Sequence, residues 1–141
     1  MPAEWRRWVV PALAWTLAAL NGAAALGKAL DVPGFLLVLV EYRLLPGPLL
    51  FPGTLALILA EAAIAIGLLL PRARHAAALA AAALAALYGA ALTVTLLRGI
   101  ALQNCGCFGV FLPRPLTLFS PLEDGLLVAM ALLLAQRTRP A

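Results

Sequence analysis

The sequence predicts an all-α integral membrane protein, a bundle of four transmembrane helices with an interfacial or re-entrant segment on its outer face. Of its 141 residues, 65% are hydrophobic and 11% are charged, whereas soluble domains average about 45–50% apolar and about 25% charged residues. Four apolar runs are long enough for helices that cross a bilayer, which takes about 20 residues. We therefore expect a single membrane domain over residues 1–141.

The four expected spans are apolar runs bounded by charged or turn-forming residues. They cover residues 8–30, 49–70, 75–97 and 121–136. The fourth is the shortest, and its start is predicted by Ser120 as N-cap, Pro121 as first helical residue and Glu123 as capping-box acid. Small residues recur every four positions in the first and third spans, which favours close helix packing. The residues concerned are Ala14, Ala18, Gly22, Ala78, Ala82, Ala86 and Ala90.

The linker DVPGFLLVLVEYRLLPGP joins the first two spans and is itself apolar. Pro33 and Pro46 bound it, and Glu41 and Arg43 interrupt it. It is too short to cross the hydrocarbon core, so an interfacial or re-entrant helix is the expected form.

The basic residues predict the orientation in the membrane. One side carries Arg6, Arg7, Arg72, Arg74, Arg137 and Arg139, and the other carries Lys28, Arg43, Arg98 and Arg114. Short loops rich in Lys and Arg stay cytoplasmic, so both termini are expected in the cytoplasm of a bacterium, with the protein in its inner membrane. Because these residues form no basic stripe, the expected partner is the lipid bilayer and not nucleic acid. The loop at 98–120 then faces outward, where disulfides persist.

That loop contains both cysteines of the chain, Cys105 and Cys107, separated only by Gly106. A disulfide between them closes a small ring of unfavourable geometry, and glycine best supplies the backbone angles it needs. A structural disulfide gains most by closing a long loop, whereas strained disulfides are labile and typical of catalytic pairs. The spacing therefore favours a redox centre over a structural bridge.

Two other function classes stay open from the residues alone. A Cys-x-Cys pair can bind a thiophilic metal ion, with Glu123 or Asp124 as further ligands, although zinc needs four ligands and the only histidine, His75, lies at the cytoplasmic turn. Such a protein would bind or transport the ion. Alternatively, inert cysteines would indicate a non-catalytic membrane assembly factor.

Three ionisable residues are candidate partners of the thiols. Asp124, in the first turn of the fourth span, could accept a proton from a thiol, hold Lys28 or Arg98 nearby, or complement the helix dipole. Glu61 lies in mid-membrane, where charge is costly and usually functional; it could transfer protons beside a bound quinone or bond to Asn21. Lys28 could act as a charge partner or extend to the headgroups.

Together these residues resemble the methylamine-utilisation MauE family, a branch of the DoxX-like four-helix membrane proteins. The resemblance covers nearly the whole chain and departs from the family in Val32, which separates Asp31 from Pro33. It rests on Asn104-Cys105-Gly106-Cys107-Phe108-Gly109, on Lys28 with Asp31 and Pro33, on Glu61 with Gly67, and on Asp124.

The resemblance implies a protein that works on disulfides with a periplasmic thioredoxin-like partner, as in maturation of the cysteine-rich small subunit of methylamine dehydrogenase. The fold is also similar in outline to vitamin K epoxide reductase and DsbB-type enzymes, which pass electrons from dithiols to quinone through two cysteine pairs. Because this chain has one pair, a relay would run directly from the partner to Cys105 and Cys107, then to quinone or a second partner. We expect a thiol–disulfide oxidoreductase in which Asp124, Glu61 and Lys28 assist and Cys107 is the more buried thiol.

Overall fold

The computed structural model describes residues 3–141, a stretch that contains five α-helices and no strand. The helices are α1 (Ala3–Leu30), α2 (Val32–Tyr42), α3 (Gly47–Leu69), α4 (Arg74–Leu97) and α5 (Phe119–Arg137). All but α2 are long and apolar enough to cross a membrane. The expected all-α membrane fold is confirmed, and its environment is a lipid bilayer. Helix α1 begins at Ala3 rather than at residue 8 and includes the charged segment 4–7. An acid in the first turn, Glu4, complements the helix dipole there.

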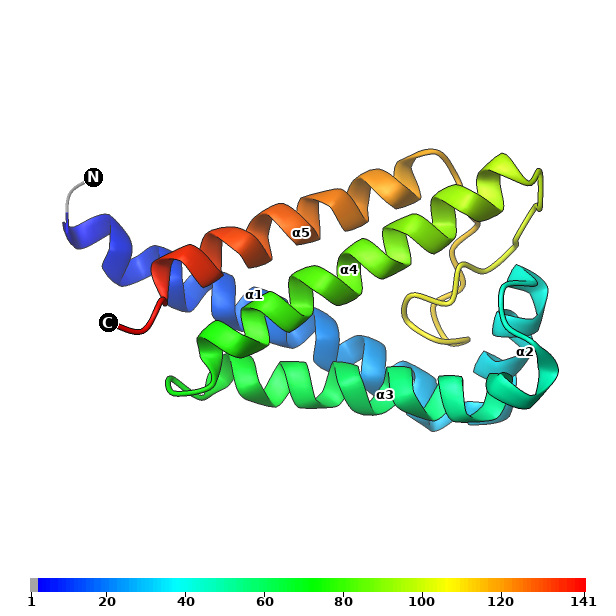
Figure 1. The fold of residues 1–141 in the computed structure, drawn as a ribbon, viewed down its shortest axis with the longest axis horizontal. Coiled ribbons are helices and arrows are strands. Elements are labelled where there is room, and N and C mark those ends of the chain that lie inside the picture. Colours follow the sequence, from blue (N-terminus) through cyan, green and yellow to red (C-terminus); the bar gives the residue numbers. More distant parts are fainter. Residues whose placement is uncertain (1–2) are drawn as a thin grey trace.

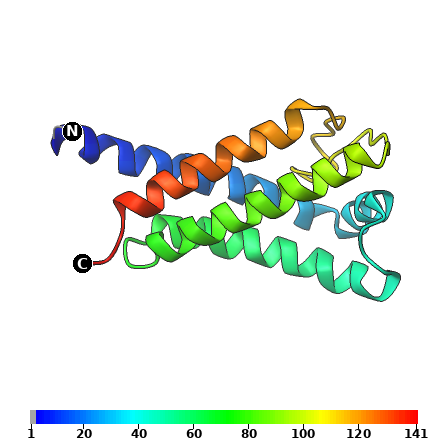
Figure 2. The ribbon, with the colours of Figure 1, turned by 45° about the horizontal axis from the view of Figure 1, so that its top comes forward.

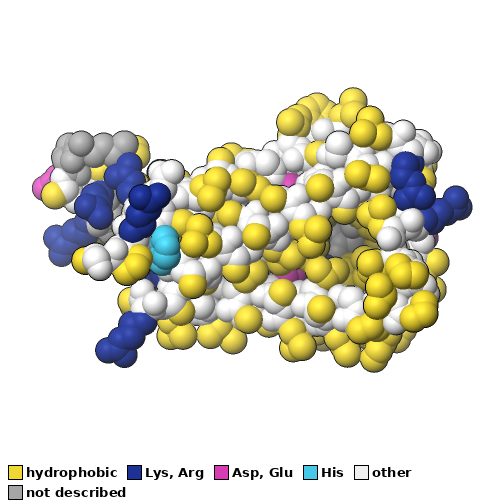
Figure 3. All heavy atoms as spheres, in the orientation of Figure 1, with side chains coloured by type: hydrophobic (Ala, Val, Ile, Leu, Met, Phe, Trp, Pro, Cys, Tyr) yellow, Lys and Arg dark blue, Asp and Glu magenta, His cyan; other side chains and the backbone are white. Residues whose placement is uncertain are grey.

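The four long helices lie side by side along the long axis of the molecule (Figures 1 and 2). The start of α1, the C-terminus and the turn between α3 and α4 lie at one end, which we call the terminal end. Helix α2 and the loop at 98–118 lie at the other, which we call the cysteine end. Figure 3 shows Lys and Arg at both ends and apolar side chains between them. This distribution suits a protein whose middle lies in hydrocarbon.

Small residues form much of the core near the terminal end. Four of the alanines expected at helix contacts are buried there: Ala14, Ala18, Ala78 and Ala82. A Cβ added to Gly67 of α3 would lie 2.8 Å from the Cβ of Ala77 of α4, so these two helices are in close contact. Ala86 and Ala90 are exposed instead, because they line an open groove between α4 and α5.

Helix α2 is the expected short helix of the linker. Its 11 residues span about 16 Å, too little to cross a bilayer. The Asp31 side chain accepts a hydrogen bond from the Gly34 amide at 2.9 Å and caps its start. At its other end Arg43 has a left-handed φ of 52°, and the Arg98 guanidinium donates to the Arg43 carbonyl at 3.1 Å. Helix α2 is thereby tied to the end of α4.

The start of α5 differs from the expected capping box. The helix begins at Phe119 without a side-chain cap. Ser120 Oγ instead accepts a hydrogen bond from the Thr117 amide at 3.2 Å. The Glu123 carboxylate accepts a hydrogen bond from the Arg114 guanidinium at 2.7 Å. The expected box is therefore wrong, because a charge-assisted bond to Arg114 takes the carboxylate that would have closed it.

Candidate functional site

The cysteine motif folds into a tight turn that is closed by Asn104. The Asn104 side chain accepts a hydrogen bond from the Gly106 amide at 2.9 Å and donates one to the Gly109 carbonyl at 3.1 Å. The Gly109 amide also donates to the Gly106 carbonyl at 3.1 Å. Both glycines have a positive φ, +75° and +76°, which residues with a Cβ rarely adopt. The motif NCGCFG is thus a self-contained backbone unit that fixes both cysteines.

The glycines of this turn also let it press against the helices. A Cβ added to Gly106 would lie 2.8 Å from Val38 Cγ1 of α2. Gly109 lies against Gly27 of α1 so closely that a Cβ on it would overlap the Gly27 carbonyl oxygen. The loop backbone therefore contacts both α1 and α2, and the thiols face the interior of the protein.

The two thiols are free, and their sulfur atoms lie 3.0 Å apart. Cys105 is 6% exposed, and Cys107 is half-buried. The expectation that Cys107 is the more buried is therefore wrong. Cys105 belongs to the apolar cluster that α2 forms with the loop, and the Tyr42 hydroxyl of α2 donates to its carbonyl oxygen at 2.5 Å. Helix α2 thus covers the first cysteine and leaves the second more accessible.

The two thiols differ in acidity. The hydrogen bond from Cys107 lowers the pKa of Cys105 to about 6, assisted by backbone amides and the charge of Arg114, although burial opposes the shift. The same hydrogen bond, then burial and the negative charges of Cys105 and Asp124, raise the pKa of Cys107. These shifts favour ionisation of Cys105 before Cys107. The thiolate is the reactive species in disulfide exchange.

A buried ion pair lies beside the thiols. Lys28 Nζ of α1 is 2.5 Å from Glu61 Oε1 of α3, and the two side chains are 1% and 2% exposed. The Tyr88 hydroxyl of α4 donates to the same Glu61 oxygen at 2.6 Å and lies 3.4 Å from Lys28 Nζ. The ammonium also faces the rings of Phe35 and Tyr88, at 5.2 and 5.0 Å from their centroids. Three helices thus meet at one charged cluster.

The ion pair rules out one expected role of Lys28 and one expected partner of Glu61. Lys28 does not extend to the headgroups, because its ammonium finds a carboxylate inside the protein. Asn21 is not the partner of Glu61, since its amide donates to the Leu17 carbonyl one turn earlier at 2.9 Å. In a medium of low dielectric constant the opposite charge is the stronger partner.

Asp124 is 6% exposed and lies in the second turn of α5, not in the first turn as expected, because the helix begins at Phe119. Its Oδ2 atom is buried without a hydrogen-bond partner in the described part of the chain. The expected pairing with Arg98 is wrong, because that guanidinium bonds to the carbonyls of Tyr42 and Arg43. A buried carboxylate oxygen of this kind is available to accept a proton.

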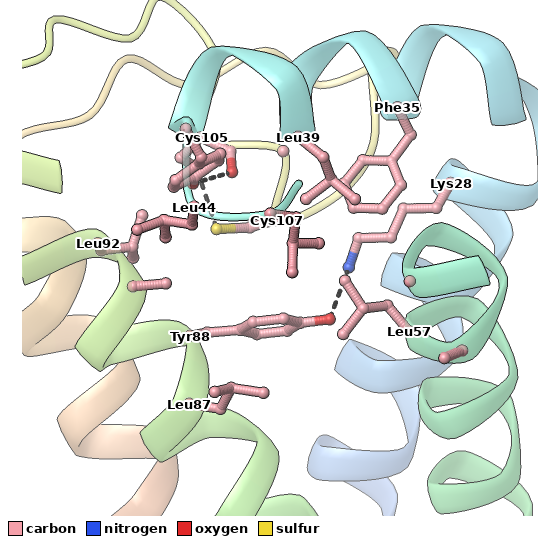
Figure 4. A pocket seen from close by; sticks show the side chains of 16 residues that line it. Lys28, Phe35, Leu39, Leu44, Leu57, Leu87, Tyr88, Leu92, Cys105 and Cys107 are labelled. Atoms are coloured by element: carbon pink, nitrogen blue, oxygen red, sulfur yellow. Dashed lines mark hydrogen bonds between the residues drawn. The ribbon is translucent and has the colours of Figure 1, made fainter. Parts of the chain in front are cut away.

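Two cavities meet at the thiols. An apolar cavity of about 360 Å³ lies among α2, α3 and α4, and a more polar one of about 240 Å³ lies among α1, α4 and α5. Tyr88, Cys105 and Cys107 line both. Lys28 lines the apolar cavity, whereas Glu61 and Asp124 line the polar one. In Figure 4 the Lys28 ammonium and the Cys107 sulfur lie on the same side of the Tyr88 ring.

Four site residues were not assigned from the sequence: Tyr42, Tyr88, Asn104 and Arg114. The tyrosines carried a usable signal, since the chain has only two and both contact the site.

No three His, Cys, Asp or Glu side chains of residues 3–141 come close enough together to hold a metal ion.

Comparison with known proteins agrees with the motifs. Residues 6–137 match the family model of methylamine utilisation protein MauE. The chain is 37% identical over 131 residues to a methylamine utilization protein MauE of Paracoccus denitrificans, across 90% of this chain and 70% of that protein. It is 41% identical over 91 residues to a protein of the same name from Methylophilus methylotrophus, across 64% of this chain and 48% of that protein. No solved structure matches the chain significantly.

Proposed function

The chain belongs to the methylamine utilisation protein MauE family, and on that premise we propose that it is a membrane thiol–disulfide exchange protein serving methylamine utilisation. The observation that carries the proposal is the pair Cys105 and Cys107, whose sulfurs lie 3.0 Å apart in a turn fixed against the helices. A pair so close can alternate between dithiol and disulfide with little backbone movement. Its product would be a disulfide in methylamine dehydrogenase or in another secreted protein.

The proposed direction is oxidation of the partner. A thiolate of the partner attacks Cys107, the more accessible sulfur of the disulfide, and Cys105 leaves as a thiolate. The partner's second thiolate then attacks the mixed disulfide and displaces Cys107. The partner has then lost two electrons and become a disulfide, and the pair has gained them and become a dithiol. The lowered pKa of Cys105 supports this direction, because a stabilised thiolate makes the disulfide form a better oxidant and a better leaving group.

The proposed partner is a periplasmic thioredoxin-like protein that approaches the cysteine end. Arginines at both termini and in the turn between α3 and α4 all lie at the terminal end. The positive-inside tendency then favours a cytoplasmic location for that end in a bacterial inner membrane, with the cysteine end in the periplasm.

Three buried ionisable residues have proposed supporting roles. Asp124 accepts the proton that Cys107 loses when the dithiol is oxidised again, since its unpartnered Oδ2 atom is buried and the residue lines the same cavity as the thiol. Lys28 and Glu61 hold a fixed charge pair beside the sulfurs. A cation held near the thiols favours their ionised forms.

The test is exchange between the purified, disulfide-form protein and a reduced thioredoxin. We expect one partner disulfide to form per pair, and we expect Cys105→Ser and Cys107→Ser to abolish the reaction while the helices stay folded by circular dichroism. With a thioredoxin that lacks its resolving cysteine, peptide mapping should find the mixed disulfide on Cys107. Unchanged exchange in both serine variants would sink the proposal. Full maturation of the physiological partner by a double Cys→Ala variant would instead identify an assembly factor.

A further inference from the structure

The apolar cavity beside the thiols opens toward the bilayer. Its walls include Leu57 and Ala56 of α3 and Leu87 of α4, and both Ala56 and Leu87 are exposed. These two helices are membrane spans by length and composition. Figure 3 shows a hollow on this face near the cysteine end. A ligand could therefore enter sideways from the hydrocarbon without crossing either aqueous phase.

The polar groups of this cavity are gathered near the thiols. Lys28, Tyr42, Tyr88 and the two cysteines contribute them, and most other lining side chains are aliphatic or aromatic. An ammonium has three N–H donors. Glu61 and Tyr88 accept two of those of Lys28, which leaves one for a ligand oxygen. The complementary ligand has an apolar body and a polar head that accepts hydrogen bonds.

The volume agrees with a small-molecule site. The cavity measures about 360 Å³, inside the range of about 300–1,000 Å³ found for ligand pockets. That space accommodates a ring-sized head group with the beginning of a chain, while the rest of a long chain would lie in the bilayer. The sulfur of Cys107 faces the same space, so a bound head group would lie beside the thiol pair.

We infer that this cavity binds a membrane-soluble isoprenoid quinone, which re-oxidises Cys105 and Cys107. The inference rests on the proposed function, because a pair that oxidises its partner must afterwards lose two electrons itself. In the step, the S–H bond of Cys107 breaks and one S–S bond forms with the thiolate of Cys105. The quinone takes the two electrons and two protons, one lost by Cys107 and one from water, and leaves as the quinol with two new O–H bonds. Lys28 donates a hydrogen bond to the quinone oxygen and stabilises the negative charge that develops there.

The test uses the purified protein in lipid nanodiscs without oxygen, with the pair first reduced and decylubiquinone added as the probe. Loss of quinone absorbance and of alkylatable thiols should proceed together, one quinone per pair. Ala56→Phe fills the opening and should lower the rate at limiting quinone at least tenfold. Ala63→Phe is the matched control, because Ala63 is exposed on the same helix two turns away and does not line the cavity. It should react like the unmodified protein.

The outcomes separate this inference from the proposed function. Ala56→Phe should still exchange disulfides with thioredoxin at the normal rate. If the protein exchanges with thioredoxin but never reduces decylubiquinone, the quinone site is overturned and the proposed function stands. If neither reaction occurs, both fail. Quinone reduction that is equal in the Ala56→Phe and Ala63→Phe variants would show that quinone reacts elsewhere. A phospholipid retained in the cavity and not displaced by decylubiquinone would identify a lipid site instead.

Discussion

The Glu61→Gln variant tests the buried ion pair most sharply. Glutamine keeps the shape of the side chain and an oxygen for the Tyr88 hydroxyl, but it removes the negative charge that lies 2.5 Å from Lys28 Nζ. The ammonium is then a buried charge without its counter-charge. Removing one partner of a buried pair typically costs about 3–5 kcal/mol. At about 2–4 °C per kcal/mol, the unfolding temperature should fall by on the order of 10 °C.

The exposed pair of Arg114 and Glu123 supplies the control. Its side chains are 49% and 50% exposed, and exposed pairs contribute about 0–1 kcal/mol. Glu123→Gln should therefore lower the unfolding temperature by no more than about 4 °C. Both variants would be compared by thermal unfolding in the same detergent, followed by circular dichroism. Equal shifts in the two variants would refute the reasoning. So would a double variant Lys28→Met with Glu61→Leu that is less stable than Glu61→Gln alone, because paired apolar replacement leaves no charge uncompensated.

Three further predictions concern the cysteine turn. Because the pKa of Cys105 is lowered to about 6, its alkylation rate in the reduced protein should rise with pH, with a midpoint near pH 6. Cys107→Ala removes the hydrogen bond between the two sulfurs and should move this midpoint to higher pH. A midpoint near the ordinary thiol value of about 8.5 in both proteins would contradict the assignment. Gly106→Ala should slow disulfide exchange at least tenfold, because its Cβ would lie 2.8 Å from a side chain of α2. Gly99→Ala is the control, since Gly99 has a similar φ but open space around it; it should cost only about 1–2 kcal/mol of stability and keep the exchange rate. Equal exchange rates in the two variants would show that contact with α2 is unimportant. Tyr42→Phe leaves the Cys105 carbonyl without its donor and should lower the free energy of unfolding by about 1–3 kcal/mol in a denaturant titration, and no change would show that this bond contributes nothing.

Local features of the fold could be predicted from the sequence, because each is encoded in one stretch of chain. The long apolar runs gave the spanning helices, and two prolines around a short apolar linker gave α2. The start of α5 could not be predicted in this way. There the choice between a capping box and an ion pair depends on Arg114, which the loop brings back to Glu123.

The site shows the same division. The closeness of Cys105 and Cys107 follows from their spacing, and Glu61 stands out as a charge within an apolar span. Its pairing with Lys28 joins residues 33 positions apart and depends on how α1 packs against α3. The burial of Cys105 likewise depends on α2 folding over the loop, which no pattern within the loop indicates.

The central claim is that Cys105 and Cys107 form a working redox pair, and a redox titration tests it most directly. Purified protein would be equilibrated across a glutathione or dithiothreitol series, and its thiols counted by alkylation and mass shift. The account predicts a reversible two-electron transition at a potential well above the roughly −300 mV typical of structural disulfides. Thiols that stay reduced across the whole series, or that retain a metal ion and resist alkylation, would contradict it.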